Sequence, residues 1–500
     1  MNIKHPSFKI IKNHLKKSAI FLLLFVFITS GCKVSYDDIS LGNPADEKGE
    51  INNFPQDNYG YIIYDVEEGK IARGHNIRKE FTPASVTKLF TALFAAETLG
   101  RDYTFSTTLS YDGKTTDNIL TGNLYLTGTG DPELSINELL SIVTGLKSKN
   151  IKEVKGKFYY DETGFTPREE LDKDMPADGY YNAGISPLSF NSNIIYALQR
   201  KNSEGKIVSA DLLPSLPSFN SYIYNENLPY PFFRFKISDG KETWGLPDKN
   251  LWDSRQQLPV KHAGLFTAQI FQKLCGIHGI KLPAPESGKN TESSKVIYEF
   301  RSKPLTSIIK NMLLTSNNMT AEIIYTVSSG LYFKKQSSNI KETSAMEHFY
   351  RNNFTAMEWK NFRIANASGL TNINKATPEQ TTGILLFIEK LNDENFRLED
   401  LLPVSGWDGT MRTRLDQPEA AFRVYGKTGS IFYASALAGM FYAKSGKRYI
   451  FTIYINDNVK RSEYDAKINK TADDLNQGGA WSKKAASAID EFVLKMIEQL

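Results

Sequence analysis

A predicted helix that is apolar on nearly every side follows residue 82. Thr82 and Pro83 are typical of an N-cap and a first helical residue, and Gly100 is typical of the position after a last turn. Between them the chain reads VTKLFTALFAAETL, a stretch in which few side chains are polar. Since such a helix has no face suited to water, other elements must cover it on all sides. We therefore expect it in the middle of a domain.

Strand patterns at both ends of the chain predict a sheet that could cover this helix. They are residues 60–66 and 71–74, joined by the turn EEGK, and residues 422–430, 434–443 and 449–457. A polar stretch, residues 458–479, precedes a predicted amphipathic helix that ends at residue 500. We expect an α+β fold in which both ends share one sheet with helices packed on it, so that Ser85 lies near Lys427.

The middle of the chain has a different pattern. Residues 101–135 and 151–165 alternate like strands, residues 213–256 look like a small β-rich insert, and residues 261–280 and 304–330 look helical. At roughly 100–200 residues per domain, 500 residues correspond to two to four domains.

The first 31 residues predict an export signal. Five lysines precede an apolar run, Ala19 to Ile28, and small residues lead to Cys32. A permanent membrane helix needs about 20 apolar residues, so a transmembrane anchor is the weaker alternative. The ending Ser30-Gly31-Cys32 resembles the lipobox of bacterial lipoproteins, although Thr29 stands where that pattern usually has an aliphatic residue. We expect Cys32 to be lipidated, and the protein to be exported and held on the periplasmic side of a membrane.

Removing this signal changes the charge balance of the chain. Residues 1–31 hold five of the 60 basic residues and none of the 56 acidic ones, which leaves 55 against 56. No basic surface is predicted for nucleic acid. Cys275 is then the only other cysteine, so an internal disulfide is excluded. Residues 32–57 are polar and rich in Pro, Gly and Asn, which predicts a flexible tether.

Ser85 and Lys88 form the first candidate catalytic pair. Three positions apart on a helix, their Cβ atoms lie about 5–6 Å apart on one face. A serine hydroxyl needs a base to become a nucleophile, and a lysine can be that base if burial or a second cation lowers its pKa. Both conditions are plausible here, because the helix is apolar and Lys427 can supply the second cation. The pattern S-x-x-K starts six times in the chain, so alone it proves little.

Two further motifs follow the first in a fixed order. Ser316-Asn317-Asn318 comes directly after an apolar helical stretch, and Lys427-Thr428-Gly429 ends a predicted strand. The ordered set S-x-x-K, S-x-N and K-T-G is typical of penicillin-binding proteins and serine β-lactamases.

The chain resembles the low-molecular-mass class C penicillin-binding proteins, the D-alanyl-D-alanine carboxypeptidase/endopeptidase family. Ser316 lies 231 positions after Ser85, a spacing that fits the two domains inserted in this family. The stretches that carry the resemblance are GNLYLTGTGDPELS (122–135), YYNAGISPLSFNSN (180–193), SNNMTAEII (316–324), ASGLTNINKATPEQ (367–380) and LPVSGWDGTMRTR (402–414).

The resemblance implies a domain organisation. Residues 58–105 and 300–500 would form a β-lactamase/transpeptidase-like catalytic domain, an antiparallel sheet flanked by helices. Two smaller β-rich domains would be inserted in it: domain II, residues 106–192 and 257–299, and domain III, residues 193–256.

The resemblance also implies a role for each motif residue. Ser85 would attack the carbonyl between two terminal D-alanines of a peptidoglycan stem peptide, with Lys88 as general base. Ser316 would relay the proton to the leaving amine and Asn318 would orient Lys88 and the substrate. The substrate-binding residues would be Lys427, Thr428, Gly429 and Ser430, and the N–H groups of Ser85 and Ser430 would form the oxyanion hole. β-Lactam antibiotics would enter the same path and stall as acyl-enzymes.

One loop departs from the family. Asn366 and Asn372 stand where the family usually has an aspartate and an arginine, and that arginine contacts the third residue of the stem peptide. The departure bears on specificity, because the three catalytic motifs are intact.

Alternatives to this function remain. A β-lactamase would need a deacylating base, for which the sequence offers no convincing motif, and an idle wall-binding lipoprotein would not need all three motifs. No metal or organic cofactor is expected, since the six histidines have no ligand spacing.

Overall fold

The computed structural model describes residues 34–42, 48–225, 233–249, 255–336, 344–391, 393–394, 396–467 and 470–500. The predicted export signal and Cys32 lie outside these residues. Residues Val34–Leu500 cluster as one unit. In the part of the chain that the structure describes, no helix is long and apolar enough to cross a membrane.

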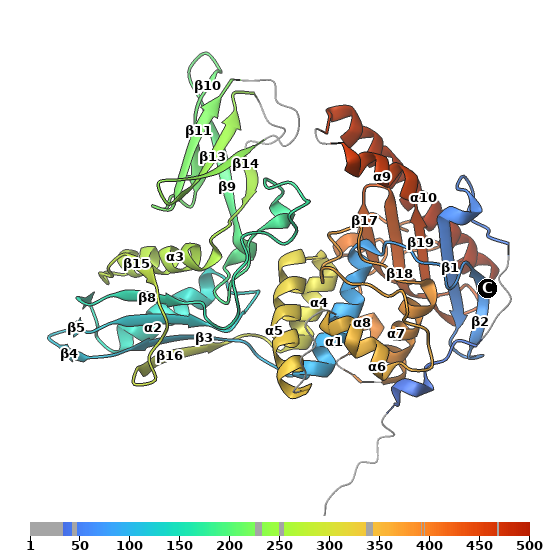
Figure 1. The fold of residues 1–500 in the computed structure, drawn as a ribbon, viewed down its shortest axis with the longest axis horizontal. Helices are drawn as coiled ribbons and strands as arrows, with labels where there is room; N and C mark the ends of the chain where they lie inside the picture. Colours follow the sequence, from blue (N-terminus) through green and yellow to red (C-terminus); the bar gives the residue numbers. More distant parts are fainter. Residues whose placement is uncertain are drawn as a thin grey trace, which may run out of the picture. The chain divides into compact units, whose positions relative to one another are not determined.

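A five-stranded antiparallel sheet joins the two ends of the chain, as the strand patterns predicted (Figure 1). Its order is β17 (Val424–Ile431), β18 (Ala434–Tyr442), β19 (Arg448–Asn456), β1 (Tyr59–Asp65) and β2 (Lys70–His75). The first and last parts of the chain meet where β1 pairs with β19, with Tyr59 opposite Ile455 and Asp65 opposite Tyr449. This pairing confirms the α+β fold and places β17, with its K-T-G motif, at one edge of the sheet.

Alternate side chains of the sheet serve two hydrophobic cores. Ile62 and Ala438 point to the core that also holds α1 (Thr87–Leu99) and α7 (Pro378–Leu391). Ile63 and Leu437, their sequence neighbours, point to the core that holds α10 (Ala472–Gln499). Because side chains alternate along a strand, each face of the sheet is covered by its own helices.

The helix α1 is enclosed, as its sequence predicts. Eleven of its thirteen residues are buried, and it packs against α4, α5, α6 and α7. The bounds of the neighbouring helices are α4 Leu305–Thr315, α5 Asn318–Gln336, α6 Ala345–Asn353 and α8 Leu398–Leu401.

The predicted start of this helix is wrong. Thr82 does not cap it: its N–H donates to Asn456 Oδ1 at 2.6 Å. A short 3₁₀ turn, Ala84–Val86, precedes α1 instead, and Pro83 occupies its N-cap without a side-chain bond. Ser85 therefore lies in a turn just before the helix.

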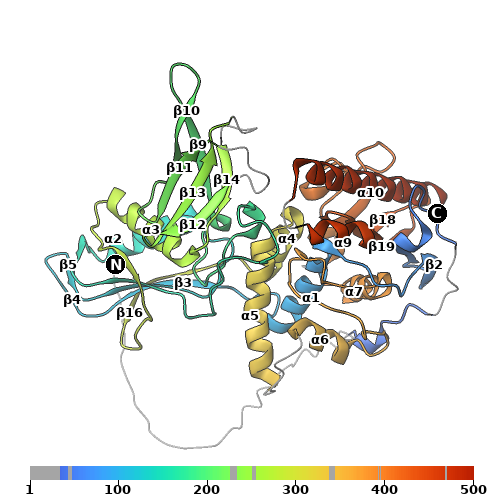
Figure 2. The ribbon, with the colours of Figure 1, turned by 45° about the horizontal axis from the view of Figure 1, so that its top comes forward.

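The described residues between α1 and α4 form four further sheets (Figures 1 and 2). One sheet has the order β15, β8, β6, β3, β16, and a small one has the order β4, β5, β7. Two three-stranded sheets follow, β10-β9-β14 and β11-β13-β12. The bounds are β3 Ser106–Tyr111, β4 Lys114–Thr116, β5 Ile119–Thr121, β6 Leu124–Gly128, α2 Ile136–Ser148, β7 Glu153–Val154, β8 Phe158–Asp161, β9 Ile194–Lys201, β10 Ile207–Leu213, β11 Phe219–Tyr224, β12 Arg234–Ser238, β13 Lys241–Pro247, β14 Arg255–Pro259, α3 Ala263–Ile277, β15 Pro285–Ser287 and β16 Lys295–Arg301.

These sheets share one hydrophobic core. It draws side chains from the predicted domain II, such as Leu126 and Phe158, and from the predicted domain III, such as Trp244. We call residues 106–299 the inserted region; the boundaries of domains II and III stay a prediction.

Part of the predicted tether is packed rather than flexible. Tyr36 stacks on Phe387 with ring centroids 4.7 Å apart, and Ile39 and Leu41 are buried. Because residues 32–57 are mostly polar, their composition did not indicate that these three apolar side chains, two or three positions apart, would pack on the protein. The expectation of a tether is therefore wrong for residues 34–42.

The polar stretch 458–479 also contains more helix than predicted. Residues Asn458–Ala466 form α9, and α10 begins at Ala472, well before its first apolar turn. Asp457 caps α9, accepting from Lys460 N at 3.1 Å. Thr471 caps α10 through a capping box with Asp474.

Candidate active site

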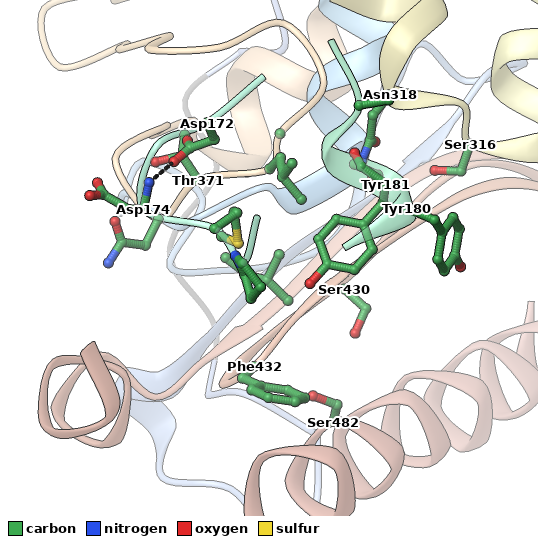
Figure 3. A pocket seen from close by; sticks show the side chains of 18 of the residues that line it. Asp172, Asp174, Tyr180, Tyr181, Ser316, Asn318, Thr371, Ser430, Phe432 and Ser482 are labelled. Carbon is green, nitrogen blue, oxygen red and sulfur yellow. Dashed lines mark hydrogen bonds between the residues drawn. The ribbon is translucent and has the colours of Figure 1, made fainter. Parts of the chain in front are cut away.

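The three predicted motifs meet at one cleft of about 1260 Å³. Its lining includes Ser85, Ser316 and Asn318 from the first two motifs and Ser430, which directly follows the third. Figure 3 shows Tyr180 and Tyr181 on the opposite side of the cleft from Phe432 and Ser482, with Ser430 between them.

Ser85 lies in a tight turn that neighbouring loops approach closely. Ala84, the residue before it, has a φ of 46°, a left-handed conformation that is unusual for a residue with a Cβ. A Cβ added at Gly369 would lie 1.8 Å from Ala84 O. The 366–370 loop therefore presses against the backbone of the turn, which holds the Ser85 hydroxyl at the cleft.

Lys88 reaches Ser85 from the first turn of α1. Its Nζ lies 3.0 Å from Ser85 Oγ, 2.8 Å from Asn318 Oδ1 and 2.6 Å from Ser368 O. The Lys88 side chain is fully buried. These contacts place one amine between the hydroxyl of the first motif and the amide of the second.

The environment of Lys88 favours its neutral form. Burial lowers the pKa of its ammonium well below the usual value, and the positive charge of Lys427 lowers it further. The carboxylate of Glu322 acts in the opposite direction and raises the pKa. Both effects expected from the sequence, burial and a second cation, are present. A neutral lysine amine can accept the proton of a serine hydroxyl.

Ser316 and Asn318 lie where α4 ends and α5 begins. Ser316 has a φ of 56° as the C-cap of α4, and Asn318 is the first residue of α5. The Asn318 side chain donates from Nδ2 to Tyr181 O at 3.1 Å, while its Oδ1 faces Lys88. Asn318 therefore contacts the inserted region through its Nδ2 and α1 through its Oδ1.

Lys427 connects the third motif with the second. Its Nζ donates to Ser316 Oγ at 2.9 Å and to Thr428 O at 2.7 Å. Burial lowers the pKa of Lys427 to about 7. Thr428 and Ser430, which alternate with it along β17, lie on the other face of the strand, and Ser430 is exposed at the cleft.

Gly429 allows β17 to approach the nucleophile. A Cβ at this position would lie 2.6 Å from Pro83 O and 3.1 Å from the backbone nitrogens of Ser85 and Val86. Only glycine fits without displacing the turn, so the backbone N–H groups of residues 85 and 430 can both face the cleft. This is the arrangement that an oxyanion hole requires.

Several residues of the cleft were not foreseen. They come from the inserted region and from the C-terminal part: Asp172, Asp174, Tyr180, Tyr181, Phe432, Arg461, Tyr464 and Asp465. The resemblance in the stretch 180–193 was a signal for the tyrosines, whereas α9 was read as a polar connection and gave none.

The loop whose sequence departs from the family pattern uses its two asparagines, Asn366 and Asn372, for local contacts. Asn366 Oδ1 accepts from the backbone N–H groups of Gly369 and Leu370 at 2.9 and 3.0 Å, a role that an aspartate would also fill. Asn372 donates to Asp465 of α9, and Arg461 Nε donates to the same carboxylate at 2.8 Å. An arginine charge is therefore present in the cleft, but α9 supplies it.

Within the described residues, no cluster of His, Cys, Asp or Glu could hold a metal ion. The groups assembled around Ser85 are a buried amine, two further hydroxyls, an amide and a second lysine. Together they can perform nucleophilic acyl transfer on a substrate that carries a carboxylate.

Comparison with known proteins agrees with this geometry. Residues 46–476 match the family described as "D-Ala-D-Ala carboxypeptidase 3 (S13) family". The D-alanyl-D-alanine carboxypeptidase DacB of Haemophilus influenzae is 26% identical over 416 residues, which are 80% of this chain and 85% of that protein. The crystal structure of penicillin binding protein 4 (dacB) from H. influenzae matches with a TM-score of 0.70 and 22% identity, covering 88% of this chain and 96% of that one.

A second structure of that protein, in complex with a β-lactam, matches with a TM-score of 0.64 and 24% identity, over 80% of this chain and 90% of that one. These likenesses confirm the transpeptidase-like fold and the resemblance to low-molecular-mass class C penicillin-binding proteins. The chain belongs to the D-Ala-D-Ala carboxypeptidase 3 (S13) family.

Proposed function

We propose that this chain is a penicillin-sensitive serine D,D-carboxypeptidase that hydrolyses D-alanyl-D-alanine ends of peptidoglycan stem peptides through an acyl-enzyme on Ser85. D,D-endopeptidase activity on peptide cross-links would use the same site, because the bond cleaved is also D-alanyl. The observation that carries the proposal is the enclosed amine of Lys88, 3.0 Å from Ser85 Oγ. Family membership supports the substrate class.

Acylation begins when Lys88 removes the proton of Ser85. The neutral Nζ accepts this proton while Ser85 Oγ attacks the carbonyl carbon of the penultimate D-alanine. Negative charge then develops on the carbonyl oxygen. The backbone N–H groups of residues 85 and 430 would donate to this oxygen, and in other enzymes one such donor contributes about 10²–10³ in rate.

Collapse of the tetrahedral intermediate needs a proton on the leaving nitrogen. Ser316 Oγ, which Lys427 Nζ holds at 2.9 Å, would give its proton to the leaving nitrogen and regain one from the Lys88 ammonium. The C–N bond breaks, D-alanine leaves as an amine, and Ser85 carries the acyl group as an ester. The hydroxyls of Thr428 and Ser430 would bind the terminal carboxylate of the leaving D-alanine, and Lys427 would supply positive potential.

Water completes the cycle by hydrolysing the ester. Lys88, neutral again after the proton relay, would activate this water and return the proton to Ser85 Oγ. A penicillin has an amide in its four-membered ring and a nearby carboxylate, so it would acylate Ser85 by the same steps. Its ring nitrogen stays attached, blocks the approach of water and leaves a long-lived ester.

Release of D-alanine tests this proposal. The purified protein should release D-alanine from a peptide ending in D-alanyl-D-alanine, and Ser85→Ala should not. Hydrolysis of penicillin without release of D-alanine would favour the β-lactamase alternative. Neither activity, in a protein that is folded, would favour the idle lipoprotein.

The proposal includes export and a lipid anchor, supported by the charged, apolar and small-residue pattern that ends at Cys32. Cells that express the natural chain should incorporate labelled palmitate into the protein and retain it in the membrane fraction. Cys32→Ala should remove the label. Equal labelling of both proteins would contradict an anchor at this residue.

A further inference from the structure

One face of α5 is covered by a segment of the inserted region. Leu171 and Ile185 from this segment form a small buried cluster with Met319 and Ile323 of α5 and with Leu370 of the 366–370 loop. We call residues 165–185 the bracing segment, because it contacts both the helix and the loop that hold the catalytic groups.

The bracing segment makes two polar contacts on this face. Tyr181 O accepts from Asn318 Nδ2 at 3.1 Å, and Arg168 Nη2 donates to Glu322 Oε2 at 3.0 Å. Asn318 and Glu322 are four positions apart, so they lie one turn apart on the same side of α5. The backbone of Arg168 is itself fixed by paired hydrogen bonds with Ile185.

Glu322 links the contact with Arg168 to the general base, Lys88. Its second oxygen, Oε1, accepts from Ser368 N at 2.9 Å, and Ser368 O accepts from Lys88 Nζ at 2.6 Å. Glu322 is 1% exposed and Ser368 is fully buried. An unbroken series of hydrogen bonds thus runs from Arg168 in the inserted region to the amine beside Ser85.

The charges along this series act on Lys88 in opposite directions. The Glu322 carboxylate raises the pKa of Lys88, against the effects of burial and of Lys427. The guanidinium of Arg168 offsets that carboxylate, because opposite charges in contact cancel much of each other's field. The Glu322 charge also acts to raise the pKa of two further groups near it, Asp172 and Tyr325.

We propose that Arg168 and Glu322 are positioning residues for acylation. Glu322 fixes the Ser368 carbonyl that holds Lys88 beside Ser85, and Arg168 neutralises the charge of the Glu322 carboxylate. The inference rests on the proposed function, since it assigns the pair to the same reaction. It gives the inserted region a part in the chemistry, in addition to lining the cleft.

The pH dependence of acylation distinguishes this role from a merely structural one. The rate constant for acylation by benzylpenicillin should fall at acidic pH as Lys88 becomes protonated. Arg168→Gln leaves the Glu322 charge without its partner, which raises the pKa of Lys88. The fall of the rate constant at acidic pH, called the acid limb, should therefore move to higher pH. Glu322→Gln keeps an oxygen for Ser368 N–H but removes the charge, so the limb should move to lower pH.

The double variant and a conservative variant sharpen the test. Arg168→Gln with Glu322→Gln removes both charges and should restore the limb toward the wild-type position, as expected for coupled residues. Arg168→Lys keeps the charge and should stay near wild type. On the acid limb, Arg168→Gln should acylate about tenfold more slowly than Arg168→Lys.

A second ion pair provides a matched control. Arg78 and Glu379 also join a partly exposed guanidinium to a buried carboxylate, with NH2 and Oε1 3.1 Å apart. The groups that shift the pKa of Lys88 are Lys427 and Glu322, and Glu379 is not among them. Arg78→Gln should therefore lower thermal stability without moving the acid limb.

The possible outcomes distinguish failure of the positioning role from failure of the proposed function. Folded Arg168→Gln and Glu322→Gln proteins whose limbs coincide with wild type would overturn the positioning role and leave the proposed function intact. A wild-type protein that benzylpenicillin does not acylate would overturn the proposed function and this inference with it.

Discussion

Lys88 and Lys427 are both fully buried in the same site, yet their contacts suit them to different tasks. Lys88 faces the hydroxyl of Ser85 and two oxygen acceptors, and its neutral form is favoured by burial and by the second cation. Lys427 has a pKa near 7, so below that pH it keeps a charge for a substrate carboxylate. One lysine is therefore suited to remove a proton and the other to bind an anion.

The first prediction concerns the pH dependence of substrate binding. Burial lowers the pKa of Lys427 to about 7, so the free enzyme loses this positive charge as the pH rises above that value. KM for a peptide ending in a D-alanine carboxylate should rise about fivefold between pH 7 and pH 8. Lys427→Arg, which stays charged, should remove the rise. A KM that is constant from pH 6 to pH 9 in the wild type would contradict this assignment.

The second prediction concerns Gly429. In Gly429→Ala the new Cβ would meet Pro83 O at 2.6 Å, so β17 or the nucleophile turn must shift. We expect acylation by a β-lactam to slow by about 10²–10³, as after loss of an oxyanion donor. Gly479→Ala is the control, because its Cβ would meet no atom within 4 Å. Equal acylation rates for the two variants would show that the close approach has no catalytic role.

At the scale of residues, the sequence located the motif residues but not their supports. The three motifs lie at the cleft because each has a recognisable local pattern. Glu322 and Ser368 lie in stretches that resemble the family, but the resemblance did not indicate their contact: a backbone carbonyl leaves no mark in a sequence, and Glu322 reaches Ser368 across 46 positions. Such contacts depend on tertiary packing, which periodicity does not encode.

At the scale of elements, the apolar pattern located the buried part of α10 but not its start. The start of α10 was placed too late because its first turns are polar and only later turns pack on the sheet. The capping box at Thr471 and Asp474 marks the true start. The helix α9 was missed for the same reason, since none of its residues is buried.

A third prediction tests the cap of α10. Thr471 Oγ1 accepts from Asp474 N at 3.2 Å, so Thr471→Ala should lower the free energy of unfolding by about 1 kcal/mol. Ser487→Ala, an exposed serine within the same helix, should cause no loss. Urea denaturation of both variants measures the difference. Equal midpoints would mean that the cap does not contribute.

At the scale of the whole molecule, the sheet that joins the chain ends was predictable and the packing of residues 34–42 was not. Strand-like apolar segments marked all five strands, and the sheet that they form accounts for the meeting of Ser85 and Lys427. By contrast, composition alone suggested a tether, although Tyr36 lies 4.9 Å from Phe354 and 4.7 Å from Phe387 between ring centroids.

A fourth prediction follows from that packing. Tyr36→Ala removes the aromatic contacts and the hydrogen bond from Tyr36 OH to Glu97, so residues 34–42 should detach locally. Limited proteolysis should then cleave this segment faster, while acylation of Ser85 stays unchanged. Ile277→Ala, at a side chain that is 71% exposed, is the control. Cleavage at the wild-type rate would contradict a packed segment.

The acyl-enzyme on Ser85 is the central claim, and an intact-mass measurement tests it most directly. The purified protein and its Ser85→Ala variant are each incubated with benzylpenicillin. We predict that the wild type gains the mass of one penicillin, on the peptide that contains Ser85, and that the variant gains none. An unmodified wild-type protein, or equal modification of both proteins, would contradict the account.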